Sequence, residues 1–191
     1  MKNIITVGLL LMSFILKAQE VSVEKNLNSV QAGLLSLSYQ NETLLDRKST
    51  LKSEVGLRPS IAEVIYFDGK KERSFLIIPY LNLEPRWYYG LDRRSRLKKN
   101  TKNNSSNYIS LLTSFTSTRT ELVNTKNFEV APFIKIVPEF GIRRTSKSGH
   151  FFSEYSIGYG YQHNFFDKAY KYTYDKNQAI IDFQYKIGFI F

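Results

Sequence analysis

The chain has 191 residues, no cysteine and a formal net charge of +10. Its length is typical of one domain, and the lack of cysteine excludes disulfides as a source of stability. Aromatic residues make up 15% of the chain. After the N-terminal segment, no apolar run approaches the roughly 18–20 residues of a membrane helix, so a membrane protein of this composition must cross with strands.

Residues 1–18 are predicted to be a secretory signal peptide. Lys2 supplies a positive charge, an apolar run of 13 residues covers 4–16, and Leu16-Lys17-Ala18 indicates cleavage between Ala18 and Gln19. A membrane anchor is the alternative, but the run is too short to span a bilayer. The chain that remains carries 25 basic and 17 acidic residues, a net charge of +8. Residues 19–27 are predicted to form a short polar tail.

Apolar and polar residues then alternate with a period of two, which predicts β-strands. The eight predicted strands cover residues 29–40, 50–58, 61–67, 74–89, 108–117, 128–144, 150–165 and 178–191. Gly33 indicates a bulge, Pro59-Ser60 a turn, and Asp68-Gly69 a hairpin. Segment 61–67 could instead continue 50–58, which would leave seven strands.

Strand 74–89 raises a difficulty. Pro79 and Pro85 lie on one face, and each removes an N–H donor from the ladder.

The last strand shows the alternation most clearly. Every second residue from Ala179 to Phe191 is apolar, and a terminal aromatic strand of this kind resembles the assembly signal of outer-membrane β-barrels. The sequence therefore predicts an all-β fold, an eight-stranded antiparallel up-and-down transmembrane β-barrel over residues 28–191. An even strand number puts both termini in the periplasm. The loops expected outside are 41–48, 68–73, 118–127 and 166–177, and the periplasmic turns are 59–60, 90–106 and 145–149.

Several segments strengthen this interpretation. They are Leu51–Leu57, Glu84-Pro85-Arg86-Trp87-Tyr88-Tyr89, Asn107–Leu111, Gly141–Arg144 and Gly158–Tyr161. Together they resemble small outer-membrane β-barrel proteins of flavobacteria and related Bacteroidota, over most of the mature chain. The resemblance implies a Gram-negative source and an outer-membrane location. It does not indicate which activity the chain has, and it assigns no functional residues. Outer-membrane lipid and the barrel assembly machinery are therefore the expected partners.

The inward faces of the predicted strands carry charges of both signs. Because an eight-stranded barrel is just wide enough for side chains, and an isolated buried charge is very costly, these charges are expected to pair in one network. Its members are Lys52, Glu54, Arg58, Glu84, Arg86, Lys135, Glu139, Arg143, Glu154, Asp182 and Lys186. The network predicts a plugged lumen; a narrow ion or proton channel is the alternative.

Two further groups stand out at the predicted strand ends. An aromatic girdle at one membrane interface is expected from Trp87, Tyr88, Tyr89, Phe151, Phe152, Phe189 and Phe191. The turn after strand 74–89 holds an anion-binding candidate, which comprises Arg93, Arg94, Arg96, Lys98, Lys99 and Lys102. These residues could engage lipid phosphates, or they could simply form a solvated turn. They lack the interleaved aromatics of a nucleic-acid platform, so no nucleic-acid partner is expected.

The sequence gives little indication of a catalytic site. His150 falls in a turn and His163 on the outward face, with no serine nearby, and no cluster has metal-ligand spacing. We therefore expect neither an enzyme nor a cofactor, but a structural or surface-interaction barrel. The alternatives are a barrel enzyme acting on lipid A and a soluble barrel of the lipocalin type, whose alternation would look the same with the faces reversed.

Overall fold

The structure is a computed structural model that describes residues 21–65, 68–117, 122–126, 131–165 and 175–191. The predicted signal peptide lies outside the described residues, as do residues 66–67 of the predicted third strand and 128–130 of the predicted sixth. Half of the predicted loop 118–127 and most of the predicted loop 166–177 also lie outside them. Among the described residues, no helix has the length and apolar character needed to cross a membrane.

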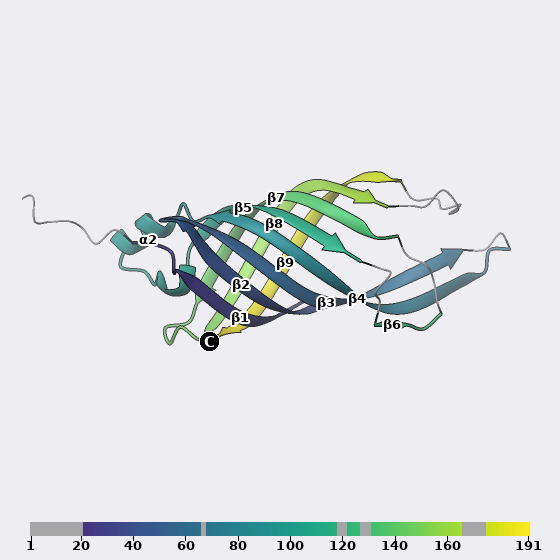
Figure 1. The fold of residues 1–191 in the computed structure, drawn as a ribbon, viewed down its shortest axis with the longest axis horizontal. Helices are drawn as coiled ribbons and strands as arrows, with labels where there is room; N and C mark the ends of the chain where they lie inside the picture. The colour runs from purple at the N-terminus through teal and green to yellow at the C-terminus, as the bar shows by residue number, and fades with distance from the viewer. Residues whose placement is uncertain (1–20, 66–67, 118–121, 127–130, 166–174) are drawn as a thin grey trace, which may run out of the picture.

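One antiparallel sheet of nine strands closes in a ring (Figure 1). The strands are β1 Asn26–Gly33, β2 Ser36–Asp46, β3 Ser49–Ile65, β4 Lys71–Trp87, β5 Asn107–Thr116, β6 Val123–Asn124, β7 Phe133–Thr145, β8 Phe151–Asn164 and β9 Asn177–Ile190. All strands except β6 form the closed ring. Each of these eight pairs with its neighbour in chain order, with β5 next to β7, and β9 pairs with β1. Among the described residues, the two-residue β6 pairs only with β4. The all-β, antiparallel prediction is confirmed.

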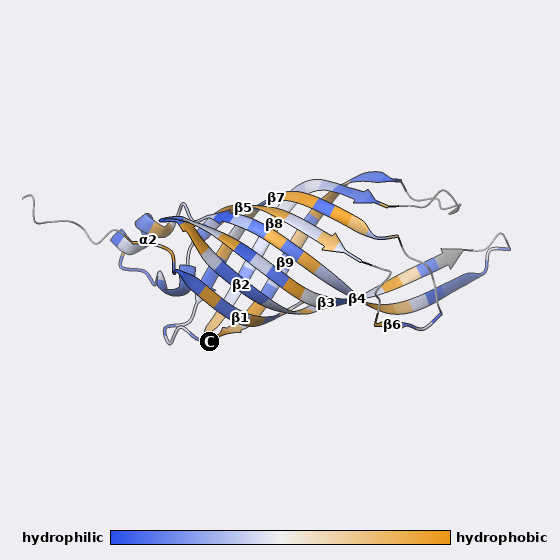
Figure 2. Ribbon diagram, in the orientation of Figure 1, coloured by the Kyte–Doolittle hydropathy of each residue, from blue (hydrophilic) through white to orange (hydrophobic). Residues whose placement is uncertain are grey.

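The two faces of the ring differ in polarity. Large apolar side chains on the outside are exposed, among them Leu37, Ile157 and Phe183, while charged and polar side chains inside are buried. Figure 2 shows the resulting alternation of hydrophobic and hydrophilic residues along the strands. Successive side chains of a strand point to opposite faces, so the period-two pattern places the polar set inward.

The first predicted strand is in fact two strands. Residues 29–40 divide into the end of β1 and the start of β2, joined by a two-residue turn at Leu34-Leu35. Gly33 therefore ends β1 and does not form a bulge. A Cβ at this glycine would lie 2.4 Å from Ser36 Oγ. The close approach of Ser36 to residue 33 at the turn therefore requires a residue without a side chain.

The second and third predicted strands are one strand, β3. Pro59-Ser60 is not a turn: Pro59 pairs with Ile77 of β4 in the middle of a continuous ladder. The β2–β3 ladder ends at Leu37–Leu57, so β3 has only β4 as a described partner from residue 58 onward. Proline is tolerated on such an edge because no ladder N–H is needed there.

The prolines of β4 fit the sheet by a similar route. Pairing of β4 with β5 covers residues 80–83 and resumes at Arg86, so it leaves out Pro85. Pro79 lies one residue beyond the start of this ladder at Tyr80. The strain expected from these two prolines is therefore relieved by local gaps in strand pairing.

The ring has two distinct ends. The terminal end holds residues 21–25, Phe191, the turn at Arg47-Lys48, the connection 88–106 and the turn 146–150; the distal end holds the Leu34-Leu35 turn and the β3–β4 hairpin (Figure 1). The predicted placement of loop 41–48 at the end opposite the termini is wrong, because most of it belongs to β2. Val23 N–H donates to Arg47 O at 3.0 Å, which ties this turn to the N-terminal segment.

Candidate functional site

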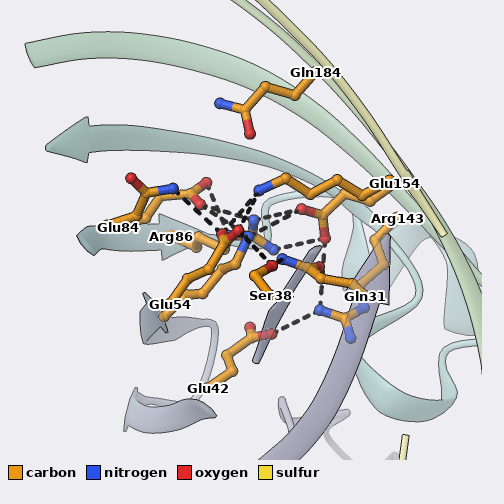
Figure 3. A network of polar contacts seen from close by, with 12 residues as sticks. Gln31, Ser38, Glu42, Glu54, Glu84, Arg86, Arg143, Glu154 and Gln184 are labelled. Atoms are coloured by element: carbon orange, nitrogen blue, oxygen red, sulfur yellow. Dashed lines mark hydrogen bonds and ion pairs between the residues drawn. The ribbon is translucent and has the colours of Figure 1, made fainter. Parts of the chain in front are cut away.

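Four carboxylates and four cations meet inside the ring (Figure 3). We call this group the interior ion network; its members are Glu42, Lys52, Glu54, Glu84, Arg86, Arg143, Glu154 and Lys186. The exposed fraction of each residue is 6% or less. Its formal charges cancel, as burial of so many charges requires.

Arg86 is the geometric centre of the network. Its guanidinium donates two hydrogen bonds of 2.9 Å to Glu84 and two of 2.9 and 2.6 Å to Glu154. Such bidentate arginine–carboxylate contacts are among the strongest hydrogen bonds in proteins. The guanidinium also lies over the Tyr108 ring, 4.2 Å from its centroid. That ring occupies the space that a Cβ on Gly141 would need, so the glycine admits the aromatic support of Arg86.

The remaining contacts join several strands of the wall. Lys52 lies 3.1 Å from Glu54 and 3.5 Å from both Glu84 and Glu154. Lys186 lies 2.8 Å from Glu54. Strands β3, β4, β8 and β9 are therefore linked through their side chains across the interior.

The structure brings seven of the eleven predicted interior charges into this network. Lys135 and Asp182 form a separate pair at 2.8 Å, and Glu139 accepts a hydrogen bond from Gln184. Arg58 instead lies over the Tyr80 ring, 4.4 Å from its centroid. These four lie outside the network because they sit closer to the distal end of their strands.

Sequence reasoning missed Glu42, which binds Arg143 at 2.8 Å and accepts hydrogen bonds from Thr50 and Tyr88. The segment 41–48 was expected to be a loop. The signal was nevertheless present, because Ser38, Gln40 and Glu42 continue a polar period of two.

The connection between β4 and β5 closes the terminal end. It contains helix α2 (Leu91–Arg96) and the short 3-10 helix η1 (Lys102–Asn104). Leu91 packs in a cluster with Val23, Tyr88 and Tyr108. Asn104 donates to Glu42 Oε1 at 3.0 Å and accepts from the Glu24 N–H at 2.8 Å. The expectation of a solvated turn is thus wrong for these buried residues, although the basic side chains do reach solvent.

The basic side chains of this connection lie on its outer surface. Arg94 donates to Asn100 O and Lys102 to Ser148 O. Lys102 is nevertheless exposed, as are the other four, Arg93, Arg96, Lys98 and Lys99. Nearby, Asp92 lies 2.5 Å from Lys48 and 3.2 Å from Arg47, and the hydrogen bond from Lys48 lowers the pKa of Asp92. Its carboxylate is thus already paired, which leaves Arg93, Arg96, Lys98 and Lys99 available to anions.

This basic surface should speed the approach of the chain to an anionic membrane. Refolding into vesicles that contain an anionic phospholipid is expected to be about tenfold faster or more than into neutral vesicles, and salt should remove the difference. Changing Arg93, Arg96, Lys98 and Lys99 together to glutamine should abolish the lipid-charge dependence. A salt-independent rate in the parent chain would contradict this role; Lys71→Gln, at the distal end, is the matched control.

Five of the seven predicted girdle residues are exposed near the terminal end. They are Trp87, Tyr89, Phe151, Phe189 and Phe191. Phe151 and Phe189 lie edge to face with ring centroids 5.3 Å apart. Tyr88 and Phe152 are buried inside, so their assignment to the girdle is wrong. Neighbours in a strand face opposite sides, and a run of adjacent aromatics cannot share one face.

The histidines show no catalytic arrangement among the described residues. His163 Nδ1 lies 2.6 Å from Asn177 Oδ1, and its ring contacts Phe165. His150 stacks on Phe189. No cluster of three or more His, Cys, Asp or Glu residues suited to a metal ion occurs in the part of the chain that the structure describes. Comparisons with models of protein families, with curated proteins and with solved structures found no match.

Proposed function

We propose that the chain is a non-enzymatic outer-membrane β-barrel with a charge-plugged lumen and a structural or surface-interaction role. The observation that carries this proposal is the polarity of the ring. Outside, residues such as Leu37, Val55 and Phe183 are more than half exposed, whereas Lys52 and Arg143 inside are almost fully buried.

A soluble fold rarely exposes apolar surface on this scale. The same surface is favourable against hydrocarbon, and alternation of apolar-out and polar-in residues is typical of transmembrane barrels. A soluble lipocalin-type barrel would need the opposite arrangement, with apolar side chains inside. The polarity therefore favours membrane insertion over a soluble barrel.

The ends of the ring support one orientation. Exposed aromatics near the terminal end suit a membrane interface, and a terminal end in the periplasm agrees with export by the predicted signal peptide. The chain would then reach the outer membrane of a Gram-negative bacterium, with outer-membrane lipid and the barrel assembly machinery as its partners. Cell fractionation tests this location: the protein should leave the membrane only with detergent, and release into the soluble periplasm would refute the proposal.

The plugged lumen predicts negligible ion conductance. The interior ion network spans the ring and the β4–β5 connection covers its terminal end, so both obstruct the passage of ions through the part of the ring that the structure describes. Purified protein in planar bilayers should show no stable open state. Replacing Arg86 and Glu154 together with alanine should raise the frequency of transient openings, because the central side chains are shortened. A stable open conductance in the parent protein would favour the channel alternative.

A further inference from the structure

The wall of the ring has an opening on one side. β1 pairs with β9 only from Ser29–Ile190 to Gly33–Lys186, and β2 pairs with β3 only up to Leu37–Leu57. Beyond the Leu34-Leu35 turn, β9 and β3 therefore have no described partner on the sides that face the β1–β2 hairpin. Because the β1–β2 hairpin is short, it leaves a gap between β9 and β3 on the distal side of its turn.

A cavity of about 400 Å³ lies behind this gap. Six consecutive residues of β9, 181–186, line it, together with Leu34, Leu35 and Pro59. Because successive strand residues point to opposite faces, a cavity that contacts all six must wrap around the free edge of β9. The cavity thus opens through the wall, as well as lying within the ring.

The opening and the inside of the cavity differ in chemistry. Leu34, Leu35 and Ile181 at the rim are each 66% or more exposed, so the rim continues the apolar outer surface. The inner lining is polar and includes Arg58, Tyr80, Asn82 and Ser114, together with the ion pair between Lys135 and Asp182. An apolar rim with a polar interior suits a molecule with one apolar and one polar part.

Three inner groups have unused hydrogen-bonding capacity. Arg58 contacts the Tyr80 ring but makes no hydrogen bond or ion pair with any residue that the structure describes. Asn82 Oδ1 and Ser114 Oγ are buried and lack a hydrogen-bond partner within the described part of the chain. Buried polar groups are normally paired, and a guanidinium matches the planar geometry of a carboxylate.

The height of the opening favours an occupant from the membrane. β1 has eight residues, and at about 3.3 Å per residue with a tilt near 40° it rises roughly 20 Å from the terminal end. The apolar band of such barrels is about 25 Å tall. With the proposed orientation, the rim therefore lies near the outer interface, where head groups of amphiphiles are found.

We propose that this side cavity binds a single-chain anionic amphiphile, of the fatty-acid class, with its carboxylate at Arg58 and its chain leaving over the leucine rim. The small volume favours one chain over a lipid with several. This inference rests on the proposed membrane location, since the chain of the ligand would lie against the apolar outer surface.

Native mass spectrometry of the full chain, released from non-ionic detergent, tests the proposal with oleate as the probe. We expect one oleate per folded chain. Loss of a charged hydrogen-bonding partner in Arg58→Gln should weaken binding about 10- to 100-fold. Ser114→Phe should also weaken it, by filling the cavity while leaving the guanidinium in place. Arg73→Gln, an exposed arginine paired with Glu63 on the distal hairpin, should bind as the parent does.

Three results would overturn the inference. Equal binding of oleyl alcohol and oleate would mean that the apolar surface alone holds the chain. Competition by acetate at similar concentration would indicate a site for small ions. If folded protein forms no one-to-one complex with oleate, the cavity is a hydrated part of the lumen. Insertion into vesicles is measured first on the same sample: failure to insert refutes the proposed function, whereas inserted protein without bound oleate refutes only this inference.

Discussion

Glu154→Gln is expected to destabilise the folded chain by about 3–5 kcal/mol, the usual cost of removing one partner from a buried ion pair. The carboxylate of Glu154 lies within 4 Å of three cations: Arg86 at 2.6 Å, Lys52 at 3.5 Å and Arg143 at 3.6 Å. Glutamine keeps the shape but removes the charge, so four buried cations face three carboxylates. Urea unfolding in detergent, followed by fluorescence of the one tryptophan, Trp87, measures the change.

A second substitution should recover most of this loss. Adding Lys52→Met to Glu154→Gln restores charge balance and leaves three direct pairs, Glu42–Arg143, Glu54–Lys186 and Glu84–Arg86. Each of these pairs is intact in the parent at 2.8 or 2.9 Å.

Two single substitutions calibrate the effect. Glu84→Gln should cost less than Glu154→Gln, because Glu84 has two cation neighbours and Glu154 has three. Asp92→Asn removes a partly exposed carboxylate and should change stability by less than about 1 kcal/mol. A Glu154→Gln protein as stable as the parent would show that the network does not hold the ring together.

The faces of the strands were predictable from sequence, but the strand boundaries near Leu34 and Pro59 were not. Alternation placed Glu54, Arg86 and Glu154 inward without knowledge of their neighbours. It could not locate the Leu34-Leu35 turn, because neither residue favours a turn and the shift of phase at this point also fits a bulge within one strand. Pro59 gave the opposite error: it indicates a turn in isolation, but it is tolerated where β3 is an edge. The two errors offset each other in number, but the sheet has nine strands, one more than expected, because the two-residue β6 pairs with β4.

The partners within the interior could not be derived from alternation. Lys52 and Glu154 are 102 positions apart, and Glu42 and Arg143 are 101 apart. Whether such residues meet depends on strand register and on how far along the ring each one sits. The same reasoning explains Lys135, Glu139 and Asp182, which face inward as expected but lie beyond the reach of the network. The closing of the terminal end by residues 88–106 had no periodic signal at all.

Arginine in place of Ile157 should be among the most damaging changes on the outer surface. Ile157 pairs directly with Phe183 of β9, and both side chains are more than half exposed near the middle of their strands. If the apolar band lies in hydrocarbon, a charge at this depth costs about 2–4 kcal/mol. Equilibrium unfolding of the chain from lipid vesicles should give this difference for Ile157→Arg, and a similar one for Phe183→Arg.

Two control substitutions differ from Ile157→Arg in their depth in the membrane or in the face of the strand that they occupy. Phe151→Arg is on the same face but at the terminal end, where the cost should fall to about 0–1 kcal/mol. Gln184→Lys is on the opposite face, and the new ammonium can pair with Glu139, whose carboxylate already accepts a hydrogen bond from Gln184. It should therefore be neutral or mildly stabilising. A flat profile, in which arginine is tolerated equally at Ile157 and Phe151, would mean that hydrocarbon does not surround the ring, because in water an exposed charge costs almost nothing at either height.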